Sequence, residues 1–261
     1  MKRIGILTSG GDCQGLNSTI RAVAKTLYQN YGNDGVQIIG IIDGYRGLIY
    51  NETRMMKPDD FSGILTRGGT ILGTSRQPFK LMRVIDENSV DKVAEMKKNY
   101  KKLELDCLVV LGGNGTQKTA NLLREEGLNV VSLPKTIDND VACTEITFGY
   151  NTAVSVAMEA LDRLHTTGET HHRIMVLEVM GRYAGWIALE SAIAGGADVA
   201  LIPEIPYDIN KVATKIENRK KRGKNFSIVV VAEGAKPKDG EMVVQLSLIH
   251  ISEPTRHSLI S

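Results

Sequence analysis

The sequence is poor in cysteine and has no long apolar run, and both shortages exclude classes of protein. Its 261 residues contain three cysteines, Cys13, Cys107 and Cys143, an odd number too widely spaced for a disulfide framework. No apolar run reaches the roughly 18 residues that span a bilayer. Met1–Thr8 runs into a strand-like segment without the apolar region of a signal peptide. We therefore expect a protein of the reducing cytoplasm that has no membrane partner.

Neither sign of charge is in excess. The chain carries 32 Lys and Arg against 30 Asp and Glu, a net charge of +2, which is too balanced for a protein that binds nucleic acid or membrane surfaces through bulk charge. With 42% hydrophobic and 24% charged residues, the composition is that of a globular protein rather than a disordered one. At about 150 residues per domain, the length allows one large domain or two modest ones.

Short apolar runs alternate with segments of helical periodicity. The runs lie at residues 4–7, 36–42, 107–111, 130–133, 173–179, 199–202 and 227–232. Strands that alternate with helices predict an α/β fold in which parallel sheets are covered on both faces. The loop at residues 137–150 separates two such series, so we expect the domain boundary there.

Glycine is the residue in excess, with 26 of 261 positions against a usual share of about 7%. Glycines gather where strands are expected to end, in residues 9–12, 67–70, 112–116 and 180–182. Ligands bind at the carboxyl ends of parallel strands, where helix N-termini offer N–H groups to anions. Four such turns predict a phosphate site, although a single glycine turn would indicate only a loop.

The segment Leu111–Thr116, LGGNGT, lies directly between a strand and a helix. Its glycines would let the backbone approach phosphate oxygens, and Thr116 is expected to cap the helix. It is not a Walker A loop, because Gln117 stands where that motif has its second glycine, so Lys118 is expected to be solvated on the helix. No GxGxxG segment follows the first strand, which disfavours a dinucleotide-dependent oxidoreductase.

Acidic side chains follow one of the expected strands. Asp138 and Asp140 lie two residues apart in the segment PKTIDND, which also supplies the hydroxyl of Thr136. Kinase chemistry needs one carboxylate to accept a hydroxyl proton and further oxygen ligands to hold magnesium. The same segment could equally be an Asx turn that caps the next helix. The spacing alone does not decide between a catalytic loop and a structural one.

Basic side chains also lie near the glycine turns. Arg76, Arg173 and Arg182 suit bidentate binding of phosphate and stabilisation of a phosphoryl group in transfer, although each alone could be a surface arginine. His171 and His172 lack metal-ligand spacing with cysteine, so we do not expect zinc.

Seven segments together resemble the phosphofructokinase family: IGILTSGGD, RGGTILGTSR, LGGNGT, PKTIDND, EVMGRYAGW, IAGGADVALIPE and VVVAEG. The resemblance covers Met1 to Gln245. It implies two Rossmann-like three-layer α/β domains with largely parallel sheets, in which residues 1–140 bind the phosphoryl donor and residues 141–245 the sugar phosphate. It also implies a cytoplasmic homo-oligomer, dimer or tetramer, that uses Mg²⁺ to transfer the γ-phosphoryl group of ATP to the C1 hydroxyl of fructose 6-phosphate, as in glycolysis.

The resemblance assigns a role to individual residues. Asp138 would be the general base, Thr136 would contact the transferred phosphoryl group, Asp140 would help to organise magnesium, and Arg182 would stabilise charge in transit. The donor would be held by Gly11, Arg76, Gln77, Gly112, Gly113, Asn114, Gly115 and Thr116. The sugar phosphate would be bound by Thr136, Asp138, Arg173 from a neighbouring subunit, Met180, Gly181, Arg182 and Glu233.

Two positions depart from the common family pattern. Asn114 stands where that pattern has a magnesium-binding aspartate, and a neutral amide is a weaker ligand for a hard cation. The donor determinants are mixed, because Gly115 leaves room for ATP whereas Lys135 is typical of pyrophosphate-dependent members. We favour ATP, because a carboxylate at position 115 would repel its α-phosphate and is absent, with pyrophosphate as the alternative. More remote alternatives are a lipid or NAD kinase and a non-catalytic nucleotide-binding subunit.

The C-terminal segment has an unusual sequence. Residues 246–256, LSLIHISEPTR, resemble one reading frame of a transposase-type sequencing adapter; the alternative is a genuine strand followed by a Ser/Pro turn. We expect the native sequence to end near Gln245 and residues 246–261 to be a non-native tail. The family continues past this point with further sugar-phosphate ligands and with elements that complete both domains. We therefore expect the chain as written to be poorly stable and largely inactive.

Overall fold

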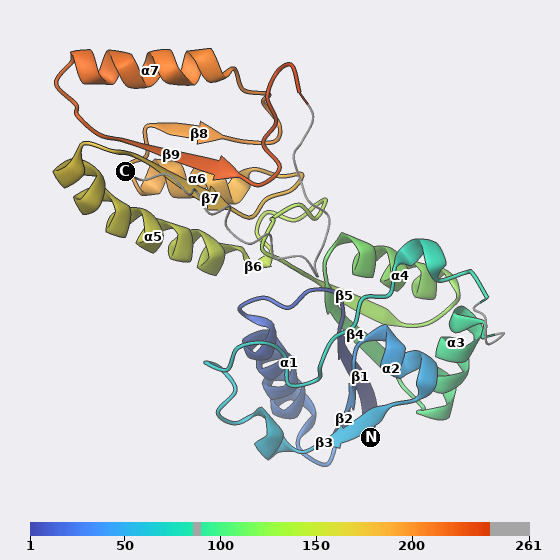
Figure 1. The fold of residues 1–261 in the computed structure, drawn as a ribbon. Helices are drawn as coiled ribbons and strands as arrows, with labels where there is room; N and C mark the ends of the chain where they lie inside the picture. The colour runs from blue at the N-terminus through green and yellow to red at the C-terminus, as the bar shows by residue number, and fades with distance from the viewer. Residues whose placement is uncertain (86–89, 241–261) are drawn as a thin grey trace, which may run out of the picture. The chain divides into compact units, whose positions relative to one another are not determined.

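The computed structural model describes residues 1–85 and 90–240, which divide into a unit formed by Met1–Glu159 and a second unit that begins at Ala160 (Figure 1). The functional boundary expected at residue 140 stays a prediction, as does the non-native tail at residues 246–261, which lies outside the described residues. None of the described helices is long and apolar enough to span a membrane.

The first unit is built on a six-stranded sheet with the order β3-β2-β1-β4-β5-β6. The strands are β1 (Lys2–Thr8), β2 (Val36–Ile41), β3 (Thr53–Met56), β4 (Cys107–Gly112), β5 (Val130–Thr136) and β6 (Phe148–Gly149). All neighbouring pairs are parallel except β2 and β3. The α/β class with a largely parallel sheet is therefore confirmed.

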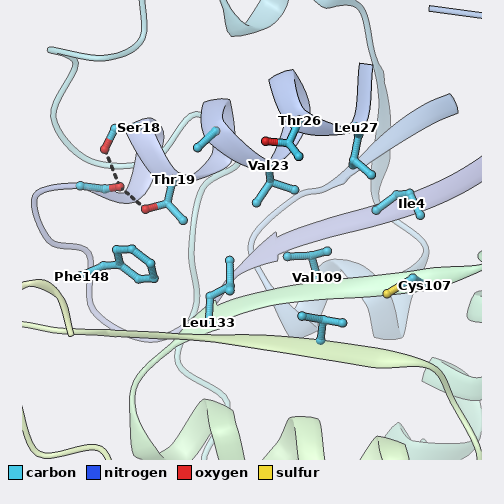
Figure 2. A pocket seen from close by; sticks show the side chains of 13 residues that line it. Ile4, Ser18, Thr19, Val23, Thr26, Leu27, Cys107, Val109, Leu133 and Phe148 are labelled. Atoms are coloured by element: carbon cyan, nitrogen blue, oxygen red, sulfur yellow. Dashed lines mark hydrogen bonds between the residues drawn. The ribbon is translucent and has the colours of Figure 1, made fainter. Parts of the chain in front are cut away.

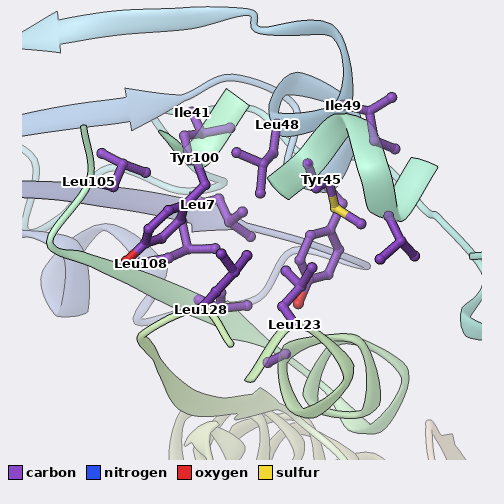
Figure 3. Packing of buried hydrophobic residues seen from close by; sticks show 14 of the residues in the cluster. Leu7, Ile41, Tyr45, Leu48, Ile49, Tyr100, Leu105, Leu108, Leu123 and Leu128 are labelled. Atoms are coloured by element: carbon purple, nitrogen blue, oxygen red, sulfur yellow. The ribbon is translucent and has the colours of Figure 1, made fainter. Parts of the chain in front are cut away.

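One face of this sheet is covered by three helices, α2 (Tyr45–Tyr50), α3 (Lys92–Lys102) and α4 (Asn114–Glu125). Alternate residues of the strands point into this layer, among them Leu7 of β1 and Leu108 of β4, both fully buried (Figure 3). The apolar body of Tyr45 lies in the same cluster, while its hydroxyl donates a 2.9 Å hydrogen bond to the main-chain oxygen of Thr116. This bond fixes α2 against the first turn of α4.

The other face is covered by α1 (Leu16–Tyr31), whose Leu16, Ile20 and Ala24 pack on β1 and β2. Toward β5 this cover is incomplete. A pocket of about 750 Å³ lies between α1 and the strands β4 and β5 (Figure 2). Val131, which lines it, is 49% exposed. Its lining is apolar except for hydroxyl groups from α1, which include those of Ser18 and Thr26. The first unit thus has one sealed sheet face and one partly open face.

The second unit has a parallel three-stranded sheet with the order β7-β9-β8. Its elements are the C-terminal part of α5 (Tyr150–His171), β7 (Ile174–Val179), α6 (Trp186–Ala194), β8 (Val199–Leu201), α7 (Ile209–Lys221) and β9 (Ser227–Ala232). The core joins Leu161 of α5 and Ala188 of α6 to Ile228 and Val230 of the central strand. Helix α7 contributes no buried residue.

Three local features differ from what the sequence pattern predicts. The glycines at positions 44 and 47 favour a turn over residues 43–47 after the second apolar run, but α2 begins at Tyr45. The predicted glycine loop at residues 112–116 is shorter, because α4 begins at Asn114. Strand β5 continues through Pro134 to Thr136, where pairing with β6 at Lys135 and Thr136 supports it.

Candidate functional site

Three loops that carry predicted site residues leave the carboxyl ends of β1, β4 and β5. Because β4 lies between β1 and β5, these strand ends are neighbours. The first two loops are joined directly, since the Ser9 amide donates a 2.9 Å hydrogen bond to the main-chain oxygen of Leu111. The hydroxyl of Thr116 donates to the main-chain oxygen of Ser9 at 3.3 Å. The sheet topology therefore brings together segments that are about 100 residues apart in sequence.

A third segment, which contains Thr74 and Ser75, forms hydrogen bonds with the loop after β1. The Gly10 amide donates to the oxygen of Ser75 at 3.1 Å, and the Thr74 hydroxyl donates to the oxygen of Gly10 at 2.6 Å. This pairing places Arg76 beside the loop: its Nη2 atom lies 3.8 Å from where a β-carbon on Gly11 would be. The structure thus places Arg76 beside Gly11, with the half-buried Gln77 next in the chain.

The backbone N–H groups at the N-terminus of α4 have no side-chain cap among the described residues. Gly113 is the N-cap, and the first turn has no acidic residue. The expected capping role of Thr116 is wrong: its hydroxyl is turned to Ser9, and Gly112 must be glycine because a β-carbon there would clash with Thr116. Around Gly115, by contrast, no atom of the described residues beyond its chain neighbours and its own helix backbone lies within 4 Å of the place that a β-carbon would take. Such a helix end attracts anions.

The loop after β5 is held by side-chain to backbone hydrogen bonds. The Asp138 amide donates to the hydroxyl of Thr136 at 3.2 Å, and Thr147 donates to the oxygen of Thr136 at 2.7 Å and, through its amide, to Asn139 Oδ1 at 2.9 Å. Asn139 has a φ of 51°, a left-handed conformation that asparagine tolerates. The loop thus contains a turn closed by the Thr136 hydroxyl, not by an Asx side chain, while Asn139 bridges to Thr147. Asp138 is half-buried beside Thr136.

Asn114 connects the second and third loops. Its Nδ2 atom donates to the main-chain oxygen of Asp140 at 3.1 Å and to the carboxylate oxygen Oδ2 at 2.9 Å. Within the part of the chain that the structure describes, no three His, Cys, Asp or Glu side chains group as a metal site. Asn114 therefore faces the predicted magnesium residue Asp140 as a hydrogen-bond donor.

Lys135 lies under these loops and is 5% exposed. Its ammonium group donates a hydrogen bond to the main-chain oxygen of Gly11. Burial lowers the pKa of Lys135, and the nearby Arg76 lowers it further, whereas Cys13, Asp12 and Asp138 oppose the shift. Burial in turn raises the pKa of the Cys13 thiol. A buried ammonium thus ties the loop after β1 to β5.

The lowered pKa of Lys135 predicts a pH dependence of stability. Between this pKa and the ordinary value of 10.5, the unfolded chain binds more protons than the folded one, so folding becomes more favourable as pH rises. The free energy of unfolding of the wild type, minus that of Lys135→Met, should increase from pH 8 to pH 10.5. Urea titrations of both proteins at several pH values measure this difference. A flat or falling difference would show that the ammonium is not desolvated.

The second unit brings together four other predicted residues at the carboxyl ends of β7 and β9. The amide of Gly181 donates to Glu233 Oε1 at 3.4 Å, and the Gly234 amide donates to the oxygen of Gly181 at 3.1 Å. Gly181 has a φ of 138°, and a β-carbon there would lie 2.7 Å from the oxygen of Ala184. Only glycine suits this position. Met180 precedes it and is 58% exposed.

Arg182 follows in the same turn, with its guanidinium carbon 5.0 Å from the ring centre of Tyr183. Its Nε atom is buried and has no hydrogen-bond partner within residues 1–85 and 90–240. Arg173, by contrast, precedes β7 and so lies at the opposite end of a six-residue strand, about 20 Å from Met180 along it. The second unit therefore does not bring Arg173 to Arg182 and Glu233.

Sequence reasoning missed the residues that brace the loops. Thr74 and Thr147 hold the segments of Gly10 and Thr136 by hydrogen bonds of 2.6 and 2.7 Å. Thr74 belongs to RGGTILGTSR, one of the segments that resemble the phosphofructokinase family, so that resemblance could have indicated it. Thr147 belongs to none of those segments.

Comparison with known proteins agrees with this arrangement. The phosphofructokinase family model matches residues 3–259. An ATP-dependent 6-phosphofructokinase of Spirochaeta thermophila is 59% identical over 90% of this chain and 64% of its own length. An ATP-dependent 6-phosphofructokinase 2 of Clostridium perfringens is 54% identical over 98% of this chain and 70% of its own length.

A solved structure gives the same result. Phosphofructokinase from Saccharomyces cerevisiae superposes with a TM-score of 0.80 at 31% identity, over 91% of this chain and 34% of that one. The chain thus spans 64% of the Spirochaeta relative and about a third of the yeast protein. The identity and the extent of these matches lead to one conclusion: the chain belongs to the phosphofructokinase family.

Proposed function

We propose that this chain forms the donor-binding and part of the sugar-binding region of a kinase that phosphorylates the C1 hydroxyl of fructose 6-phosphate with ATP. The observation that carries the proposal is the joining of three loops at neighbouring strand ends: the open N-terminus of α4, the Gly11 loop with Arg76, and the loop of Thr136 and Asp138. A phosphate-binding helix end thereby lies next to a carboxylate that can serve as a base.

In this proposal, Asp138 is the general base. It accepts the proton of the sugar hydroxyl as that oxygen attacks the γ-phosphoryl group, and the turn that fixes Thr136, Asn139 and Thr147 holds its backbone in place. The Thr136 hydroxyl, which accepts a hydrogen bond from the Asp138 amide, would contact the transferred phosphoryl group. The backbone N–H groups of α4 and the guanidinium of Arg76 hold the donor's phosphates and counter their charge.

ATP is the donor that the site favours. No described atom beyond the chain neighbours and the backbone of the same helix lies within 4 Å of a β-carbon built at Gly115, so the residue leaves space beside the phosphate loop. Lys135, the feature typical of pyrophosphate users, is engaged with the backbone oxygen of Gly11. Both relatives reported above are named ATP-dependent enzymes. Pyrophosphate remains the alternative donor for the experiment below.

The residues fit a magnesium ion that arrives with the donor. Mg²⁺ is commonly held by one or two carboxylates together with substrate phosphates and water, and this loop presents the exposed carboxylate of Asp140 near the half-buried Asp138. Asp140 would hold the ion, which would neutralise charge on the transferred phosphoryl group. The absence of a three-residue cluster in the described residues agrees with such a shared site.

The second unit supplies the sugar-phosphate ligands in this proposal. Arg182 has a buried Nε–H group without a protein partner in the described residues, and a ligand oxygen can supply the acceptor that a buried donor of this kind needs. Glu233 and the Gly181 turn lie beside it and can bind sugar hydroxyls. Arg173, at the far end of β7, would serve the 6-phosphate site of a neighbouring subunit in a homo-oligomer.

A coupled assay for fructose 1,6-bisphosphate tests the function. The chain should be compared with a version extended by the C-terminal third of the Spirochaeta relative, each with ATP and with pyrophosphate. We expect turnover by the extended protein with ATP and little by the chain alone, because the chain matches 64% of that relative's length. Turnover with pyrophosphate only would favour the alternative donor, and none with either would refute the proposed activity.

A further inference from the structure

We infer that Asn114 is a positioning residue, which orients the carboxylate of Asp140 and does not itself bind the metal. The inference deepens the proposed function, on which it rests for the role of the ion. The two hydrogen bonds from Asn114 Nδ2 to Asp140, 3.1 Å to the main-chain oxygen and 2.9 Å to Oδ2, carry it.

The atoms in contact decide which end of the amide faces Asp140. Both acceptors are oxygen atoms, one of a carbonyl and one of a carboxylate, so only the NH₂ group of Asn114 can lie against them. An amide nitrogen of this kind is not a metal ligand. The chemistry of the contact therefore requires a donor at position 114, which aspartate cannot provide at neutral pH.

The bonds also restrict Asp140 at two points. The bond to the main-chain oxygen fixes the loop, and the bond to Oδ2 fixes the side chain, which is otherwise exposed to solvent. Oδ1 is the carboxylate oxygen that neither of these two bonds engages. Since Asn114 is the first residue of α4, the carboxylate is aligned relative to the helix end that holds the phosphates. Partners that orient a metal-binding carboxylate typically change metal affinity or activity by about 10- to 100-fold when removed.

A double-mutant cycle on the 261-residue chain tests the inference. Mn²⁺ is the only ligand added, and electron paramagnetic resonance measures how much of it stays free. The variants are Asn114→Ala, Asp140→Ala and the double variant. We expect Asn114→Ala to weaken Mn²⁺ binding about 10-fold and Asp140→Ala to weaken it more. The double variant should bind as Asp140→Ala does, within about twofold, because Asn114 acts only through Asp140.

Asn121→Ala is the matched control. Asn121 lies on the same helix and donates to a carboxylate oxygen of Glu125 at 2.8 Å, so the change removes the same kind of bond two turns away. It should leave Mn²⁺ binding unchanged. If Asn114→Ala still weakens binding tenfold in the Asp140→Ala background, Asn114 is an independent ligand and the inference fails. It fails equally if Asn114→Ala or Asp140→Ala has no effect on Mn²⁺ binding.

A further variant tests whether position 114 must carry a hydrogen-bond donor. Asn114→Asp would place two carboxylates against each other and should lower the melting temperature of the metal-free chain, with Mn²⁺ restoring it more strongly than in the wild type. Equal melting temperatures without metal would contradict the inference. Both measurements are independent of sugar and of turnover. If the extended protein proves inactive while the cycle behaves as expected, only the proposed function fails.

Discussion

Replacing Asp138 with asparagine should lower kcat of the extended protein by about 1,000-fold, equivalent to about 4 kcal/mol of transition-state stabilisation. The amide has nearly the shape of the carboxylate but cannot accept the proton of the sugar hydroxyl. Hydrogen bonds of Thr136, Asn139 and Thr147 hold the backbone of the loop. The fold and the binding of ATP should therefore survive the change.

The measurement is a comparison of kcat, KM and melting temperature with those of the wild type. KM values for both substrates should change by only a few-fold, because the base acts chiefly in the transition state. Asp162→Asn, which removes an exposed carboxylate from α5, controls for the loss of one negative charge. Turnover that persists within a few-fold of the wild type would rule out Asp138 as the base.

Gly115→Asp should reduce kcat/KM for ATP by about 100-fold or more while leaving the fold intact. The new carboxylate would enter the open space at the N-terminus of α4, where it would repel phosphate and compete for the backbone N–H groups. No described atom beyond the chain neighbours and the backbone of the same helix lies within 4 Å of the added β-carbon, and an acidic residue in the first turn suits the helix dipole. The melting temperature should be unchanged or higher.

Gly115→Ala separates the charge from the added bulk. Alanine in place of glycine should stabilise the helix by up to about 1 kcal/mol and retain most of the activity with ATP. Steady-state assays with ATP and with pyrophosphate, on both variants, measure the donor preference. An aspartate variant that uses ATP as well as the alanine variant does would show that position 115 lies away from the donor.

The sheet could be predicted from the sequence because parallel strands leave a strong signal. Strands β1 and β4 are buried on both faces, so they appear as the continuous apolar runs at Ile4–Leu7 and Cys107–Leu111. Helix α2 was missed because its glycine at position 47 looks like part of a turn. That glycine is required by packing, since a β-carbon there would clash with the main-chain oxygen of Ile42.

The contacts between site residues could not be predicted, because they join distant parts of the sequence. Asn114 and Asp140 are 26 residues apart, and only the adjacency of β4 and β5 makes them partners. The sequence predicts that Asn114 is a poor magnesium ligand, and in the structure its side chain donates a hydrogen bond to Asp140, the residue proposed to hold the ion. Lys135 and Gly11 are separated by 124 residues, and their hydrogen bond follows from the strand order β1-β4-β5, in which β4 alone separates the two strands.

The partly open face of the first sheet will govern how this protein behaves at high concentration. Leu27 of α1, Val131 and Leu133 line an apolar pocket large enough to admit the side chains of another molecule. Self-association and the binding of fluorescent hydrophobic dyes should both begin at this face, and a charged residue at position 131 should suppress both. A sample can therefore aggregate while the loops at the carboxyl ends of β1, β4 and β5 are correctly formed.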